Sequence, residues 1–230
     1  MKVAFLGKGG SGKSTMATAF VRELRKRGIG VLAIDADYNM DLSYNLGAEP
    51  SVFLGNDPEK LKEHVGSVRA DTYLNALKLA KEKGFVFTIT PADGYTESIS
   101  VELENGLRLI TAGPHTDRVR SQEACSHSLA APLKVYLPLL RLNPNEAVVI
   151  DERAGTDPVA TGILSGVDLA VIVREPTVNS IRVAEQIKSE LEFAKIPHLI
   201  VENKHKGIEV DTARAAEAIF AARSSHVVSV

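Results

Sequence analysis

The sequence predicts an α/β fold of three layers, in which helices flank a mostly parallel central sheet. Short, continuous apolar runs recur along the chain, at residues 2–6, 31–35, 146–151 and 168–173. Runs of this kind are typical of parallel strands that are buried on both faces. Segments with helical periodicity, at residues 14–28 and 179–194, follow two of these runs. A chain of 230 residues is long enough to bury the core of such a fold.

The first of these units can be followed residue by residue. A strand at residues 2–6 leads into a glycine-rich loop, and the helix at 14–28 carries Met16, Phe20 and Leu24 on one apolar stripe. Gly28 is expected to close this helix, and the apolar run at 31–35 provides the next strand. Strand, helix and strand form a βαβ unit, whose crossover should be right-handed.

The remaining elements are predicted in the same way. A strand at 198–203 follows the helix at 179–194, and a helix at 210–222 precedes a last strand at 226–230. Residues 51–106 differ from the rest, because they combine helical patterns with β patterns. Helices are expected at 58–65 and 72–84, and β structure at 85–90 and 98–113, with a turn at Asn105–Gly106. No glycine- or proline-rich linker isolates this segment, so we interpret it as an elaboration within one domain spanning residues 1–230.

Composition excludes several classes of protein. Twenty-seven basic and 29 acidic residues give a net charge of −2, which offers no general basis for nucleic-acid binding. The single cysteine excludes an internal disulfide and fits the reducing cytoplasm. The first apolar run is too short for a signal peptide, and no apolar run reaches membrane-spanning length. We therefore expect a cytoplasmic protein that is not attached to a membrane.

The glycine-rich loop carries the clearest chemical signal. Gly7, Gly12, Lys13 and Ser14 satisfy the spacing G-x-x-x-x-G-K-[ST], with a strand before it and a helix after it. Glycines let backbone N–H groups converge on phosphate oxygens, and the helix N-terminus adds positive potential. Lys13 is expected to reach the β and γ phosphates, and the Ser14 hydroxyl to bind Mg²⁺. The sequence thus predicts a nucleotide site.

Carboxylates that could serve phosphoryl chemistry follow two of the predicted strands. Asp35 and Asp37 come after the run at 31–35, and Asp151 ends the run at 146–151. Because the carboxyl ends of parallel strands meet at one edge of the sheet, Asp37 and Asp151 should face the phosphate loop and the metal. Aspartates after strands also form turns and helix caps. Asp35 fits a structural hydrogen-bonding role equally well, and Asp41 is predicted to cap a helix.

The sequence resembles the deviant Walker A ATPases, which are related to MinD, ParA and the nitrogenase iron protein. Five stretches carry the resemblance, in this order: KGGSGKST, IDADYNMD, VVIDERAG, REPTVNSIRVAEQI and VENK. The resemblance covers nearly the whole chain and is weakest across residues 51–106. Within that class the sequence is most similar to the CooC-type ATPases that insert nickel into carbon monoxide dehydrogenase. The resemblance implies the P-loop NTPase fold, ATP and ADP as ligands with Mg²⁺, and hydrolysis of ATP to ADP and phosphate.

The resemblance also implies roles for individual residues. Lys8 matches the signature lysine that reaches the partner's nucleotide across a homodimer formed on ATP binding; the alternative is a solvated surface lysine. Asp37 matches the carboxylate that positions the attacking water, and Asp151 the aspartate beside Mg²⁺. Asn203 matches the residue that reads the adenine edge, although an asparagine after a strand is also a common turn former. The nucleotide-binding set implied is Gly9, Gly10, Ser11, Gly12, Lys13, Ser14, Thr15, Asn203 and Lys204.

Three features depart from the CooC-type pattern. Its Cys-x-Cys metal motif is reduced to Cys125 with His127, which could bind Ni²⁺ or Zn²⁺ between two subunits or be an unrelated thiol and imidazole. The second switch reads Asp-Glu-Arg-Ala-Gly, where the relatives usually have a smaller, glycine-containing stretch. Arg153 in it could reach the nucleotide or the partner subunit, or form a surface salt bridge with Glu152 or Glu175. The relatives continue past the last strand into a proline-containing loop that covers the purine. Here either the cap comes from elsewhere or the sequence is shortened, and weak base affinity is expected.

The leading hypothesis is therefore an ATP-driven dimerisation switch in metallocentre maturation, which would act on a client metalloenzyme such as a carbon monoxide dehydrogenase. Two alternatives remain at this point. One is a ParA- or MinD-like ATPase of spatial organisation, which the neutral charge does not favour. The other is a nucleotide-dependent interaction switch with little turnover.

Overall fold

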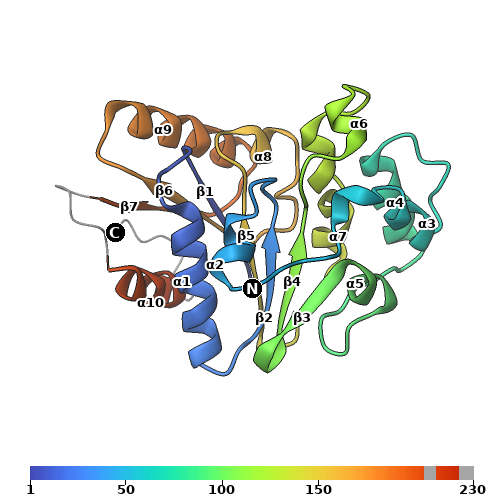
Figure 1. The fold of residues 1–230 in the computed structure, drawn as a ribbon, viewed down its shortest axis with the longest axis horizontal. Coiled ribbons are helices and arrows are strands. Elements are labelled where there is room, and N and C mark those ends of the chain that lie inside the picture. Colours follow the sequence, from blue (N-terminus) through green and yellow to red (C-terminus); the bar gives the residue numbers. More distant parts are fainter. Residues whose placement is uncertain (205–210, 223–230) are drawn as a thin grey trace.

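The structure, a computed structural model that describes residues 1–204 and 211–222, confirms the three-layer α/β architecture (Figure 1). A seven-stranded sheet has the order β3-β4-β2-β5-β1-β6-β7. Neighbouring strands run parallel, except that β3 is antiparallel to β4. The strands are β1 (Lys2–Gly7), β2 (Gly30–Asp35), β3 (Ser100–Leu103), β4 (Leu107–Thr111), β5 (Glu146–Asp151), β6 (Leu169–Arg174) and β7 (His198–Glu202).

Helices and short helical turns cover both faces of this sheet. The two longest helices are α1 and α9, whose predicted positions agree with the structure to within two residues at each end. The described α-helices are α1 (Lys13–Lys26), α2 (Asp41–Asn45), α3 (Lys60–His64), α4 (Tyr73–Glu82), α5 (Gly94–Ile99), α6 (Asp117–Arg120), α7 (Leu133–Leu139), α8 (Asp157–Ala160), α9 (Val178–Phe193) and α10 (Thr212–Ala222).

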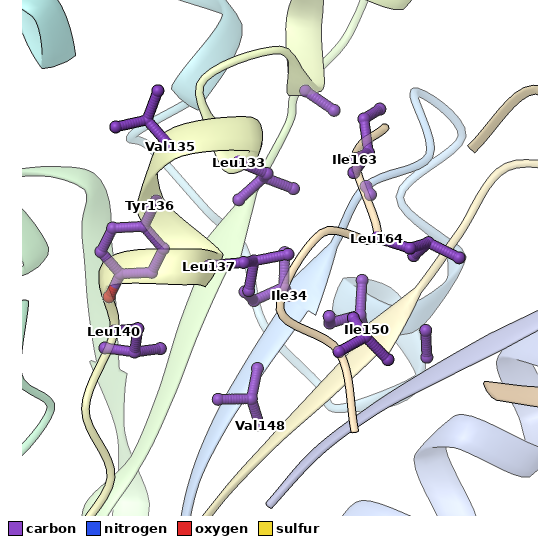
Figure 2. Close-up of a cluster of buried hydrophobic side chains, with 14 of the residues drawn as sticks. Ile34, Leu133, Val135, Tyr136, Leu137, Leu140, Val148, Ile150, Ile163 and Leu164 are labelled. Atoms are coloured by element: carbon purple, nitrogen blue, oxygen red, sulfur yellow. The ribbon is translucent and has the colours of Figure 1, made fainter. Parts of the chain in front are cut away.

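The core lies on the two faces of the sheet because side chains alternate along each strand. On one face, Val3 and Phe5 of β1 pack in a cluster with α1 and α10. On the other, Ala4 and Leu6 pack in a second cluster that includes α7 and α9. Figure 2 shows this second cluster, with Leu133, Tyr136 and Leu137 of α7 beside Ile34, Val148 and Ile150 of the sheet. Both faces of β1 are therefore fully buried, as its continuous apolar run predicts.

The segment 51–106 forms helices and one sheet edge. Its α3, α4 and α5 lie together at the end of the molecule opposite α10 (Figure 1), and β3 pairs with β4 across the predicted turn at Asn105–Gly106. The β structure predicted at 85–90 is wrong. Phe87 makes an isolated bridge to Leu140 instead, and the N–H of Thr88 donates to the side chain of Asp93 rather than to a neighbouring strand.

One smaller prediction is wrong, and another concerns residues that the structure does not describe. Asp41 is the first residue of α2 rather than its cap, because Met40 occupies the cap position in a left-handed conformation. The last strand predicted at 226–230 lies outside the described residues. Within residues 1–204 and 211–222, no helix is long and apolar enough to cross a bilayer.

The strand register places the candidate site. Asp151 at the end of β5 lies opposite Phe5 of β1 on one side and Asp35 of β2 on the other. The ends of β1, β2 and β5 therefore meet at one edge of the sheet, directly below the loop that joins Gly7 to Lys13.

Candidate functional site

The glycine-rich loop connects the end of β1 to the start of α1, as predicted. Gly7 approaches the backbone so closely that an added Cβ would overlap the carbonyl oxygen of Val173 in β6. Gly12 has a φ of 93° and is packed against the side-chain amide of Asn203, so a larger residue would be both strained and obstructed there. The phosphate-loop motif therefore requires glycine at these two positions for steric reasons, because both are packed against residues from distant parts of the chain.

Lys13 is the cation at the centre of the site. Its Nζ lies 3.5 Å from Oδ2 of Asp37 and 3.9 Å from Oδ1 of Asp151. All three side chains are buried, with exposed fractions of 8%, 7% and 0%. The structure therefore brings together the three residues that the sequence separates by up to 138 positions (151 − 13).

Asp35 has a structural hydrogen-bonding role. Its Oδ2 accepts hydrogen bonds of 2.8 Å from both the N–H and the hydroxyl of Ser43 in α2, and that hydroxyl lies 3.2 Å from Oγ1 of Thr111 at the end of β4. Burial raises the pKa of Asp35 to about 6, against the opposing effect of the Ser43 hydrogen bonds. Asp35 thus anchors α2 beside the phosphate loop.

Burial dominates the electrostatics at the end of β5. It raises the pKa of Asp151 to about 7, although the nearby charge of Lys13 favours the ionised carboxylate. It raises the pKa of Glu152 to about 8, opposed mainly by the charge of Arg153. Such shifts mark groups that have been removed from water without full compensation.

Asn203 and Lys204 hold the phosphate loop from the end of β7. Nδ2 of Asn203 donates to the carbonyl oxygen of Ser11 at 2.9 Å, in a buried contact between residues 192 positions apart. Nζ of Lys204 donates to the carbonyl oxygen of Gly10 at 2.9 Å and to Oε1 of Glu175 at 2.8 Å. Both residues are predicted nucleotide contacts; what the structure shows is that they support the loop itself.

A pocket of about 390 Å³ opens beside this loop. Most of the predicted nucleotide-binding residues line it, and α2 supplies a wall that sequence reasoning missed. Tyr44 is 60% exposed and offers an aromatic face there, a position that depends on the Asp35–Ser43 anchor rather than on a local motif. The lining residues are Gly10, Gly12, Lys13, Ser14, Thr15, Asp41, Tyr44, Asn45, Asn203 and Lys204.

The residues present fit a magnesium ion. Neither carboxylate oxygen of Asp151 has a hydrogen-bond partner among the described residues, although both are buried. Lys13 supplies one positive charge against the two carboxylates beside it. A hard dication that prefers carboxylate and hydroxyl oxygen would balance this charge, and Ser14, Asp37 and Asp151 are the side chains suited to hold it.

Other predicted nucleotide-site residues lie at the open side of the loop. Gly9, Gly10 and Thr15 are exposed, and Ser11 is buried. Nζ of Lys8 lies 3.2 Å from the carbonyl oxygen of Gly9, an exposed contact with its own neighbour. Lys8 therefore points its charge to the outer edge of the site rather than toward Asp37 and Asp151.

Cys125 and His127, the predicted transition-metal pair, are in direct contact. Sγ of Cys125 lies 2.6 Å from Nδ1 of His127, and Nε2 of His127 lies 2.6 Å from Oδ2 of Asp157. Sequence reasoning missed Asp157, which is 30 positions away from His127 and begins α8. Among residues 1–204 and 211–222, no three His, Cys, Asp or Glu side chains are grouped to hold a metal ion.

Arg153 is buried rather than on the surface. Only 7% of it is exposed, and its Nε and Nη2 have no hydrogen-bond partner in the described part of the chain. The surface salt bridge considered for it is therefore wrong: Glu175 pairs with Lys204 instead, and no described ion pair joins Arg153 to Glu152.

Comparison with known proteins agrees with this geometry. Residues 3–207 match the CobQ/CobB/MinD/ParA nucleotide-binding domain. The carbon monoxide dehydrogenase accessory protein CooC of Rhodospirillum rubrum is 31% identical over 189 residues, which cover 82% of this chain and 68% of that protein. An uncharacterised ATP-binding protein of Methanocaldococcus jannaschii is 30% identical over 196 residues, which cover 82% of this chain and 72% of that protein.

Solved structures share the fold at lower identity. MinD of Pyrococcus horikoshii, solved with Mg-ADP, has a TM-score of 0.59 and 17% identity, covering 95% of this chain and 76% of that one. A ParA family ATPase of Chlorobium tepidum has a TM-score of 0.57 and 20% identity, covering 96% and 80%. Taken with the phosphate loop and its paired carboxylates, these findings show that the chain belongs to the CobQ/CobB/MinD/ParA family of P-loop nucleotide-binding proteins and contains an ATP-binding domain of the MinD/ParA type.

Proposed function

We propose that this protein is a Mg²⁺-dependent ATPase of the cytoplasm that dimerises on binding ATP and acts in metallocentre maturation. The observation that carries the ATPase proposal is the position of Lys13, buried between Asp37 and Asp151 at the N-terminus of α1. A cation and two carboxylates below a phosphate loop are the parts that phosphoryl transfer requires, since catalysis there depends on positioning and charge stabilisation.

Each residue has a defined task in this proposal. Backbone N–H groups from Gly9 to Thr15 would surround the phosphates, and Lys13 would leave its carboxylate partners to neutralise the β and γ phosphates. When bound, Mg²⁺ would supply charge neutralisation at the phosphate oxygens, held by Ser14, Asp37 and Asp151. Asp37 would also orient the attacking water, the role that the family resemblance implies for it.

Lys8 supports the dimer part of the proposal. It lies at the outer edge of the loop, where its ammonium contacts the carbonyl oxygen of the adjacent Gly9. A second cation delivered to a triphosphate from another subunit stabilises the charge that develops in the transition state. We therefore assign Lys8 to the nucleotide of the partner subunit.

The relation to CooC supports a role in metal delivery to a client metalloenzyme. In this proposal Ni²⁺ is the cargo, with Zn²⁺ as the competing ion. Cys125 and His127 from two subunits would provide two thiolates and two imidazoles. Asp157 hydrogen-bonds the second ring nitrogen of His127, the arrangement by which a carboxylate orients a metal-binding histidine.

The proposal is tested by ATP hydrolysis and by the mass of the protein in solution, with ATP or ADP and Mg²⁺. Wild-type protein should hydrolyse ATP and form a dimer with ATP. Lys13→Ala should bind no nucleotide, and retained ATP affinity in this variant would reject the phosphate-site assignment. Arg141→Ala, an exposed change distant from the loop, is the matched control.

Nickel binding is measured separately, by Ni²⁺ titration of wild type and Cys125→Ala with ATP present. A tight site of one ion per dimer that disappears in the variant supports the cargo proposal. Absence of Ni²⁺ and Zn²⁺ binding, together with salt-sensitive retention on DNA, would favour the ParA-like alternative. ATP-dependent dimerisation with negligible hydrolysis would favour the interaction switch.

A further inference from the structure

We propose that the groove between α4, α7 and the segment that follows α8 binds a small carboxylate with an apolar body. The groove has a volume of about 530 Å³, against about 390 Å³ for the pocket beside the phosphate loop, and the two share no lining residue. Volumes of this order are typical of small-molecule sites, in which apolar walls carry a few polar groups. The lining includes Thr72, Tyr73, Leu74, Lys134, Thr161 and Ser165.

The walls of this groove are held by the core. α4 and α7 pack against each other (Figure 1). Ile163 and Leu164, which precede Ser165, are buried in the cluster that contains the apolar side chains of α7 (Figure 2). Gly166 lies so close to α7 that an added Cβ would be 2.9 Å from the Cα of Pro138. The groove is therefore formed by packed elements before any ligand binds.

Lys134 is the charged member of the groove lining. Its ammonium has no ion pair or side-chain hydrogen bond within residues 1–204 and 211–222. Burial alone lowers the pKa of Lys134, which means that no nearby carboxylate compensates for the hydration that the ammonium has lost. An anion in the groove would supply that compensation through a charge-assisted hydrogen bond.

The hydroxyl groups of the lining also favour an anion. Oγ1 of Thr72 accepts from the N–H of Asn75 at 3.2 Å, so its own proton is available to a ligand. The Ser165 hydroxyl is exposed and has no partner in the part of the chain that the structure describes. One ammonium and two hydroxyl donors, with no acidic side chain in the lining, match a carboxylate of single charge better than a phosphate dianion.

The rest of the lining requires an apolar body on this carboxylate. Leu74 is 61% exposed beside the groove. The hydroxyl of Tyr73 donates to the carbonyl oxygen of Pro58 at 2.9 Å, which leaves the ring as the surface that Tyr73 offers to a ligand. An alkyl or aryl group lying against these side chains would remove apolar surface from water. The ligand class is therefore an alkyl or aryl carboxylate.

The test uses the full chain without nucleotide, so failure of the ATPase proposal leaves its outcome unaffected. Octanoate is the probe, octan-1-ol has a body of the same length without the charge, and acetate has the charge without the body. Calorimetric titration measures affinity, and NMR of leucine methyl groups locates the probe. We expect one octanoate per chain with a Kd of about 1 mM or tighter, and methyl shifts at Leu74 and Leu77. Acetate and octan-1-ol should bind at least about tenfold more weakly.

Variants separate the charge from the apolar wall. Lys134→Gln should weaken octanoate by about tenfold, because a hydrogen bond to a charged group is lost, and should leave the affinity for octan-1-ol unchanged. Ser165→Ala should weaken octanoate by about threefold. Leu74→Asn should weaken both compounds. Lys81→Gln, at an exposed lysine of α4 outside the groove, is the matched control and should bind like wild type.

The outcomes decide the proposal. Absence of octanoate binding, equal affinities for octanoate and octan-1-ol, or an octanoate affinity that Lys134→Gln does not change would each overturn it. Lys13→Ala should bind octanoate like wild type, and loss of binding in this variant would place the probe in the phosphate-loop pocket and overturn the proposal as well. Thermal unfolding confirms that each variant is folded. If Lys134→Gln does not fold, Ser165→Ala provides the comparison at an exposed position.

Discussion

Replacing Asn203 by alanine tests how the phosphate loop is held in place. The change removes the buried hydrogen bond from Nδ2 of Asn203 to the carbonyl oxygen of Ser11, and the one from the Lys204 N–H to Oδ1 of Asn203. Leaving a buried polar group without its partner costs about 2 kcal/mol. In a chain of this size that corresponds to a melting temperature lower by roughly 6 °C.

Thermal unfolding of the nucleotide-free protein measures this effect. Asn143→Ala is the matched control, because Asn143 also donates from Nδ2 to a backbone carbonyl oxygen, that of Thr90 at 3.1 Å, but in an exposed contact. The control should lower the melting temperature much less. An equal fall in melting temperature in the two variants would refute the inference that the buried hydrogen bonds of Asn203 stabilise the loop more than an exposed one does.

Nucleotide titration then separates the two roles of Asn203. If it only supports the loop, Asn203→Ala weakens ATP and GTP by the same factor. If it also reads the adenine edge, as the family resemblance implies, ATP is weakened more than GTP, because the amide can donate to and accept from adenine. An unchanged affinity for both nucleotides would contradict both roles.

Three further perturbations follow from the same site. Lys8→Ala should leave ATP binding nearly intact but suppress ATP-dependent dimerisation and reduce hydrolysis by at least about tenfold. Light scattering measures the dimerisation and phosphate release measures the hydrolysis. An ATP-bound monomer with wild-type turnover would contradict the assignment of Lys8 to the partner's nucleotide. Asp37→Asn should trap the ATP-bound dimer, and unchanged hydrolysis would move the role of orienting water to another residue. Asp151→Asn should change the pH dependence of stability. Burial raises the folded-state pKa of Asp151 to about 7, so the fold favours the protonated carboxyl. The stabilisation from this preference is present at low pH and is lost as the pH rises through that value. In magnesium-free buffer the melting temperature of wild type should therefore fall relative to Asp151→Asn between about pH 4 and pH 7, and parallel curves would refute this account.

The sequence predicted the parts of the fold that depend on local patterns. The phosphate loop, the strands at 146–151 and 198–202 and the long helix near 178–193 all carry their signals within a few residues. The run at 85–90 has the same apolar character, yet its backbone groups bond to the end of α7 and to Asp93. No feature inside that run reveals where its partners lie.

The same limit applies to the site. Asp37 and Asp151 were predictable because parallel strands end at one edge of the sheet. Tyr44 was not, since it reaches the pocket through the hydrogen bonds of Asp35 with Ser43. Asp157 was also missed, because its contact with His127 depends on how α8 packs beside the loop that carries Cys125.

The clamp of Asn203 and Lys204 on the phosphate loop has a consequence for the order of events during synthesis. The loop is synthesised first, and the residues that hold it follow 192 and 194 positions later. At about 5–20 residues per second, the loop waits on the order of 10–40 s for its support. A nascent chain therefore acquires a formed nucleotide pocket only after β7 has joined the sheet, which delays ATP capture until the nucleotide-binding fold is nearly complete.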